Sequence, residues 1–166
     1  MRLAGRRLAG VYTSDLKRAF QTSEAIQAAT GHQPQPMAGL REIYLGEWEG
    51  LRTDELAERF PAAWSSWNEE PDWDLVPAGE GAALFETRVA AAMDSILESH
   101  HHGDVVVVTH GGVIQVALHR VVGRASRGLF PFKIQNASIS VIEKRDHRLI
   151  IAGVNDTSHL DPALVP

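Results

Sequence analysis

His110 is the residue whose type and setting most directly indicate chemistry. It follows four consecutive valines and a threonine (105–109), and it precedes two glycines and a segment with helical apolar spacing (113–122). Such a β-branched run is typical of a parallel strand covered on both faces. Ligands bind at the carboxyl edge of open α/β sheets, and a helix N-terminus there offers N–H groups to an anion. We therefore favour phosphate chemistry at His110 over a histidine that merely caps a strand.

Two further side chains could act on the same anion. Arg18 lies in the first turn of a predicted helix that follows a short strand at 10–13. Its planar guanidinium suits bidentate binding of phosphate. Glu42 lies in a glycine-punctuated loop (40–50) with aromatic neighbours, and apolar surroundings can keep a carboxyl protonated as a general acid. Taken singly, an arginine at a helix start or a glutamate in a loop is more often an ordinary surface residue, so their combination matters.

Composition excludes several classes of protein. The 166 residues include 16 basic and 21 acidic residues and no cysteine, so neither nucleic-acid binding through charge nor a cysteine metal site is expected. No apolar run is long enough to cross a bilayer, and no long apolar segment follows the basic residues near Met1. We expect one domain spanning residues 1–166, located in the cytoplasm, without nucleic-acid or membrane partners.

Hydrophobic periodicity predicts strands that alternate with helices. The end of a helix is expected at 3–8 and a surface connection at 32–36. Further helices are expected at 16–29, 53–60, 61–67, 82–99 and 113–122, strands at 10–13 and 104–108, and a hairpin at 136–144 and 149–154. Arg88 interrupts the apolar face of the long helix, and we interpret it as structural. The pattern favours an α/β fold, a three-layer sandwich whose mostly parallel sheet has an antiparallel edge hairpin.

Several segments contain motifs that occur together, in this order, in one known family. They are Tyr12-Thr-Ser-Asp-Leu-Lys-Arg18, Leu40-Arg-Glu-Ile-Tyr-Leu-Gly46, Pro77-Ala-Gly-Glu80, Val107-Val-Thr-His-Gly-Gly-Val113, Asn136-Ala-Ser138 and Asn155-Asp-Thr-Ser-His-Leu160. The chain resembles the histidine phosphatase superfamily, in its phosphoglycerate mutase-like group. One motif departs from the family pattern, because Gly81 stands where the family has a serine.

The resemblance implies both a fold and an activity. The fold is that of phosphoglycerate mutase-like proteins, and the activity is hydrolysis of small phosphomonoesters through a phosphohistidine. By the same resemblance, Glu42 and His110 are catalytic, and Arg18, His110 and Gly111 bind phosphate. No metal or organic cofactor is implied. The expected partner is a small phosphorylated substrate or inorganic phosphate, and a homodimer is among the assemblies that the resemblance allows.

The nucleophile of the family has no counterpart in these residues. The family begins with a strand ending in Arg-His-Gly, whose histidine accepts the phosphoryl group, and no Arg-His-Gly occurs here. The nearest match, His101-His-Gly103, precedes a strand and lacks the arginine, so we interpret it as a solvated turn. We expect the first strand, a loop and most of a helix to be missing, roughly 30–40 residues at usual element sizes. Truncation, a wrong start and natural loss all remain open.

The expected activity depends on that segment. This chain is predicted to be inactive, whereas a complete form is predicted to be a phosphatase, because little sequence is available for a lid that would keep water from a phosphohistidine. The alternatives are a non-catalytic remnant that binds a phosphorylated ligand, and phosphoglycerate mutase activity. A nucleotide-binding module is disfavoured, since neither G-x-G-x-x-G nor G-x-x-x-x-G-K-[ST] follows a predicted strand.

Overall fold

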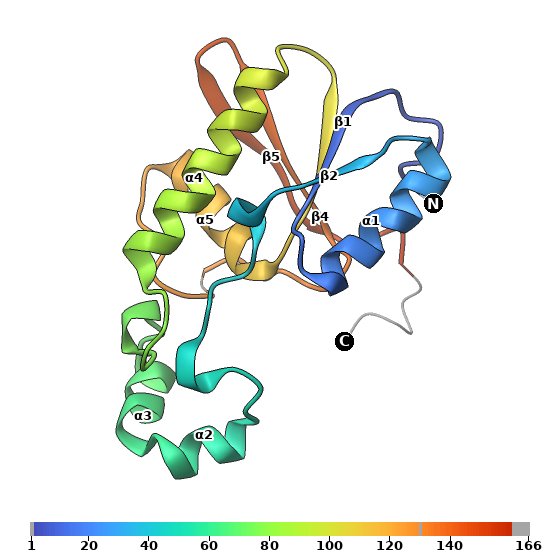
Figure 1. Cartoon of the computed structure of the whole chain (residues 1–166). Coiled ribbons are helices and arrows are strands. Elements are labelled where there is room, and N and C mark those ends of the chain that lie inside the picture. The colour runs from blue at the N-terminus through green and yellow to red at the C-terminus, as the bar shows by residue number, and fades with distance from the viewer. Residues whose placement is uncertain (1, 130, 161–166) are drawn as a thin grey trace.

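The computed structural model describes residues 2–129 and 131–160. Its main sheet has three parallel strands in the order β2-β1-β3, formed by β1 (Leu8–Thr13), β2 (Pro34–Pro36) and β3 (Asp104–Val108). Val11 of β1 pairs with Pro34 on one side and with Val106 on the other. The carboxyl ends of the three strands therefore lie at the same edge of the sheet (Figure 1).

Helices cover both faces of this sheet. On one face, Val11 and Val106 pack with α1 (Lys17–Thr30). On the other, Tyr12 and Val105 pack with α4 (Ala82–Ser99) and α5 (Gly111–Val122). Neighbouring residues of a strand point to opposite faces, so each strand contributes to two apolar cores. The predicted α/β fold with three layers is confirmed.

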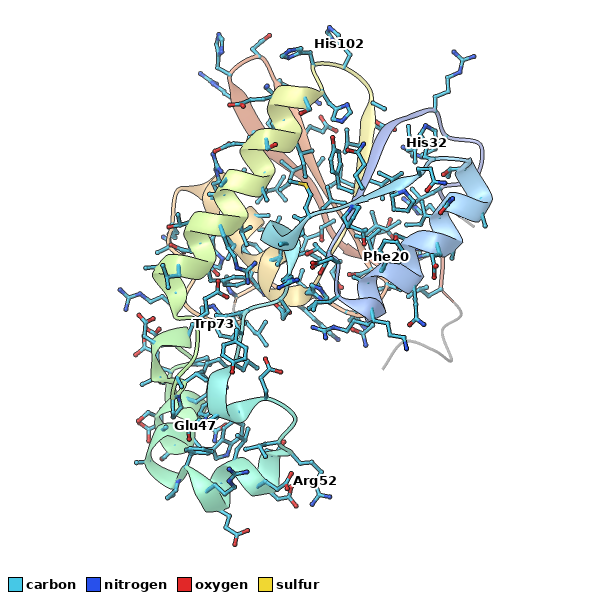
Figure 2. All side chains as sticks on the ribbon, in the orientation of Figure 1. Phe20, His32, Glu47, Arg52, Trp73 and His102 are labelled. Carbon is cyan, nitrogen blue, oxygen red and sulfur yellow. The ribbon has the colours of Figure 1, made fainter. Side chains whose placement is uncertain are left out.

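A smaller helical part projects beyond the carboxyl edge of the sheet (Figure 1). It contains α2 (Thr53–Arg59) and α3 (Pro61–Glu69). Indole rings pack edge to face within it, with Trp48 and Trp67 centroids 5.5 Å apart. Trp73 lies where this part meets the body (Figure 2), and its ring centroid is 6.2 Å from that of Phe85 on α4. Aromatic packing therefore joins the two parts of the molecule.

The hairpin consists of β4 (Ile139–Arg145) and β5 (Arg148–Asp156), which pair antiparallel as predicted. In the described residues these strands bond only to each other and form a second sheet, rather than an edge of the first. Within the same residues β3 pairs on one side only, with β1. The prediction that the valines of β3 are covered on both faces is wrong for Val107, which is 39% exposed.

Two local predictions near the N-terminus and after α1 are also wrong. Residues 2–5 form a turn, and Leu8 lies in β1 with its side chain buried, so no helix ends there. Pro34 and Pro36 belong to β2 and not to a surface connection. Proline is tolerated in β2 because this strand is at the edge of the sheet, where it has a ladder partner on one side only.

A membrane-spanning element is not found among the described helices: none is both long enough and apolar enough to cross a bilayer.

Candidate active site at the carboxyl edge of the sheet

His110 occupies the position predicted for it, between the end of β3 and the start of α5, and its side chain is buried. Its Nε2 lies 2.9 Å from Ser14 Oγ, and its Nδ1 accepts a hydrogen bond from Arg18 Nε at 3.3 Å. A guanidinium only donates, so Nδ1 carries the lone pair and the proton of the neutral ring is on Nε2. Ser14 and Arg18 thereby fix both the orientation and the tautomer of the imidazole.

Burial, together with the positive charges of Arg18 and Arg88, lowers the pKa of His110 from 6.5 to about 4. The imidazole is therefore neutral at pH 7 in the protein without a ligand. Positive charge at this edge then comes from Arg18. A bound anion would favour the protonated imidazole, because an opposite charge nearby raises the pKa of a histidine.

Arg18 lies in the first turn of α1 and is exposed. Among the described residues its guanidinium donates to His110 through Nε, which leaves the two Nη groups for a ligand. The segment before it is held by an ion pair: Arg41 donates to both carboxylate oxygens of Asp15, at 2.7 and 2.6 Å. This pair connects the start of α1 to the loop that contains Glu42.

Glu42 contacts the start of α5 through its carboxyl group. Oε2 accepts a hydrogen bond from the Gly112 N–H at 3.1 Å, and Oε1 accepts one from the Ile43 N–H at 3.0 Å. Burial raises the pKa of Glu42, although these two hydrogen bonds and the charges of Arg18 and Arg88 oppose the shift. A carboxyl group with a raised pKa is suited to donate a proton near neutral pH.

The two glycines after His110 differ in what surrounds them. A Cβ added at Gly112 would collide with Glu42 Oε1 and lie 3.2 Å from Phe85 Cζ, whereas a Cβ at Gly111 would find its nearest neighbour, Leu129 Cδ2, at 3.9 Å. The close approach of Glu42 to α5 therefore requires glycine at 112. Gly111, in contrast, has room for an added methyl group, so a ligand could approach its backbone.

Three segments far apart in the sequence thus meet at one edge of the sheet. They bring together Arg18, Glu42 and His110, which the sequence predicted, and Ser14, which it did not assign to the site. The signal for Ser14 was available, because it directly follows β1 and so lies at the same edge as His110. His102, in contrast, lies in the loop between α4 and β3 at the amino end of that strand (Figure 2).

Metal ligands do not gather here: in residues 2–129 and 131–160, no group of three or more His, Cys, Asp or Glu side chains could hold a metal ion.

Comparison with known proteins identifies the family of this chain. The model of the histidine phosphatase superfamily (branch 1) matches residues 1–157. The chain belongs to this superfamily. The match confirms the resemblance inferred from the motifs, and the matched range contains Arg18, Glu42 and His110.

Individual relatives agree with this membership. The chain is 36% identical over 153 residues to a metal-independent phosphoserine phosphatase of Arabidopsis thaliana, covering 90% of this chain and 62% of the relative. It is 30% identical over 150 residues to phosphoserine phosphatase 1 of Hydrogenobacter thermophilus, covering 90% of this chain and 71% of that protein. Among solved structures, Bacillus stearothermophilus YhfR superposes with a TM-score of 0.86 at 29% identity, over 96% of this chain and 80% of YhfR. The 166-residue chain thus spans less than two thirds of the length of the Arabidopsis thaliana relative.

Proposed function

We propose that the carboxyl edge of the sheet binds the phosphoryl group of a small phosphomonoester, and that an active form of the protein hydrolyses it. The observation that carries this proposal is the convergence of Arg18, His110 and Glu42. A guanidinium and an imidazole are hydrogen-bonded to each other at 3.3 Å, and a carboxyl group with a raised pKa contacts the helix that begins beside them. The names of the two relatives support phosphoserine as the first substrate to test.

Binding in this proposal relies on charge and on directed N–H groups. The Nη groups of Arg18 and the Nε2–H of His110 donate to the equatorial phosphoryl oxygens, and the backbone at Gly111 allows the anion to approach closely. Such preorganised donors stabilise the charge that spreads over these oxygens in the transition state. Without a ligand, the Nε2–H of His110 donates to Ser14 Oγ. The Ser14 side chain must therefore rotate away when a phosphoryl oxygen takes its place as acceptor.

The chemical step in this proposal needs a histidine nucleophile. The family's Arg-His-Gly motif, which supplies it, does not occur in these 166 residues. A histidine nitrogen from such a segment attacks phosphorus, the new N–P bond forms and the ester P–O bond breaks. Glu42 gives its proton to the departing alkoxide. The Glu42 carboxylate then takes a proton from water, whose oxygen attacks phosphorus while the N–P bond breaks, releasing phosphate. No metal or organic cofactor takes part.

One alternative function uses the same residues. Arg18 and His110, which are hydrogen-bonded to each other, would bind a phosphoryl group without a nucleophile, so the same edge also suits a protein that binds a phosphorylated ligand and does not turn it over. Both functions require phosphate to bind at Arg18 and His110, and they differ in whether phosphate is released from an ester.

Binding of inorganic phosphate tests the shared requirement. We expect the chain to bind phosphate and Arg18→Ala to weaken the affinity roughly 10-fold or more, because a charge-assisted hydrogen bond contributes about 1.5–3 kcal/mol. Isothermal titration calorimetry at pH 7 gives the two constants. Arg124→Ala is the matched control, since Arg124 is an exposed arginine that follows the end of α5. Equal affinity of the wild type and Arg18→Ala, or an equal loss in both variants, would count against the proposal.

A further inference from the structure

Arg88 makes an unusually complete set of hydrogen bonds from the middle of α4. Its Nε and Nη2 donate to the two carboxylate oxygens of Glu80, at 2.5 and 2.8 Å. Nη1 donates to the carbonyls of Gly39 and Arg41, at 3.1 and 2.7 Å, and Nη2 also donates to the carbonyl of Glu42 at 3.0 Å. A guanidinium has five N–H groups, so every one of them has an acceptor.

All four partner residues belong to the loop that contains Glu42 or hold it in place. Residues 39–42 present three carbonyls to Arg88, while Glu80 secures the next part of the loop. The Glu80 N–H donates to the Tyr44 carbonyl at 2.9 Å, and Glu80 Oε2 accepts from the Tyr44 N–H at 3.3 Å. Arg88 of α4 and Glu80, which precedes α4, thus hold the loop on both sides of Glu42.

The loop also lies very close to α4. A Cβ added at Gly39 would lie 2.8 Å from Ala92 Cβ, so the backbone of the loop rests directly on the helix. The guanidinium is only partly open to solvent, since the Arg88 side chain is 26% exposed and that of Glu80 is 16% exposed. Partial burial strengthens the bonds of a bidentate arginine–carboxylate pair relative to an exposed pair.

We propose that Arg88, together with Glu80, is a positioning residue for Glu42. Arg88 holds the backbone of residues 39–42 against α4, in the place from which the Glu42 carboxyl reaches the N–H of Gly112. Only the description of Glu42 as a general acid rests on the proposed function. The geometric part concerns the contact between Glu42 and α5, which exists without a ligand. The interpretation of Arg88 as structural, made from the sequence, is extended by its three bonds to the loop backbone.

Lysine should not replace Arg88 in this role. An ammonium group donates from a single point, whereas the acceptors of Arg88 lie around a planar fork. Arg120 offers a matched control, because it also connects secondary-structure elements by donating to a backbone carbonyl and a carboxylate, those of Ala90 at 3.0 Å and Asp94 at 2.6 Å. Arg120→Lys removes the same kinds of bonds without touching the Glu42 loop.

The test follows the resonance of the Gly112 amide during a pH titration of the 166-residue chain by NMR. In the wild type this amide donates to Glu42, so its shift should follow the ionisation of Glu42 with a midpoint above that of an ordinary glutamate. Arg18 and Arg88 are the charged groups that act on Glu42, and Arg88→Lys keeps the charge. We expect Arg88→Lys to abolish this titration of Gly112 and to return the Glu42 carboxyl midpoint toward its ordinary value, while Arg120→Lys leaves both unchanged.

An unaltered Gly112 titration in Arg88→Lys, or an equal change in Arg120→Lys, would overturn the proposal. If Arg88→Lys does not fold, Glu80→Gln is measured instead. This substitution weakens the hydrogen bonds of residue 80 to Arg88 and Tyr44, so it should change the Gly112 titration in the same direction, and an unchanged titration would overturn the proposal. These readouts need no phosphate, so a failure to bind phosphate would reject the proposed function and leave the positioning result standing. In an active form, Arg88→Lys should lower kcat roughly 10–100-fold with little change in KM.

Discussion

Phosphate release from phosphoserine is expected to rise at least roughly 10⁴-fold when the chain is extended at its amino end by the expected missing segment, namely an apolar strand ending in Arg-His-Gly and the loop and helix that lead back to β1. The 166-residue chain alone is expected to show negligible turnover. Within the described site the Nδ1 of His110 accepts a hydrogen bond from Arg18, its Nε2 carries the proton that binds phosphate, and Ser14 is fully buried. Neither residue therefore offers a free lone pair to phosphorus. Oxyanion stabilisation without a nucleophile supplies only a small part of a covalent mechanism.

The measurement compares three purified proteins in one phosphate-release assay. They are the chain alone, the form extended with Arg-His-Gly, and the same extension with glutamine in place of its histidine, which controls for any gain in stability. Turnover by the chain alone that survives repurification and disappears in His110→Gln would show that the nucleophile has been misassigned. Interconversion of phosphoglycerates faster than phosphate release by the extended form would favour a mutase over a phosphatase.

Gly112→Ala is expected to displace the Glu42 carboxyl, because the added methyl group would occupy the position of Glu42 Oε1 beside Phe85. We expect a loss of about 1–3 kcal/mol in the free energy of unfolding, as for other overpacked sites. In an active form, misplacement of the general acid should lower kcat by about 10²-fold. Urea denaturation and initial rates give the two quantities.

Gly111→Ala is the matched control for that substitution. It lies one residue away in the same first turn of α5, and the nearest atom to its added Cβ is at 3.9 Å. Alanine is favoured over glycine in a helix by about 0.5–1 kcal/mol, so this variant should be as stable as the wild type or slightly more stable. Equal destabilisation by the two substitutions would contradict the role assigned to the contact between Glu42 and α5.

The location of the site could be predicted from the sequence because it depends on short-range signals. A valine run followed by His110 and two glycines indicates a strand, a turn and a helix, and Arg18 follows a second strand in the same way. Parallel strands place such residues at one edge of the sheet. The motifs around Glu42 then bring a third segment to the same edge.

The support of the site could not be predicted, because it depends on how distant elements pack. Nothing in the local sequence of α4 indicates that Arg88 would reach three carbonyls of residues 39–42. The neutral state of His110 likewise follows from burial in the folded protein. Residues 34–36 were misinterpreted because two prolines usually indicate a connection, and only the edge position of β2 makes a strand acceptable there.

The most direct test of the site is the pKa of His110 measured by NMR with and without sulfate, which stays a dianion throughout the titration. Without sulfate we expect a midpoint of about 4. With saturating sulfate the midpoint should rise, since a bound anion stabilises the imidazolium. The complex then holds more protons than the free protein between the two midpoints, so sulfate affinity should increase as pH falls through that range. Arg18→Ala should remove the difference. A His110 midpoint that sulfate does not move in the wild type would contradict an anion site at this edge of the sheet.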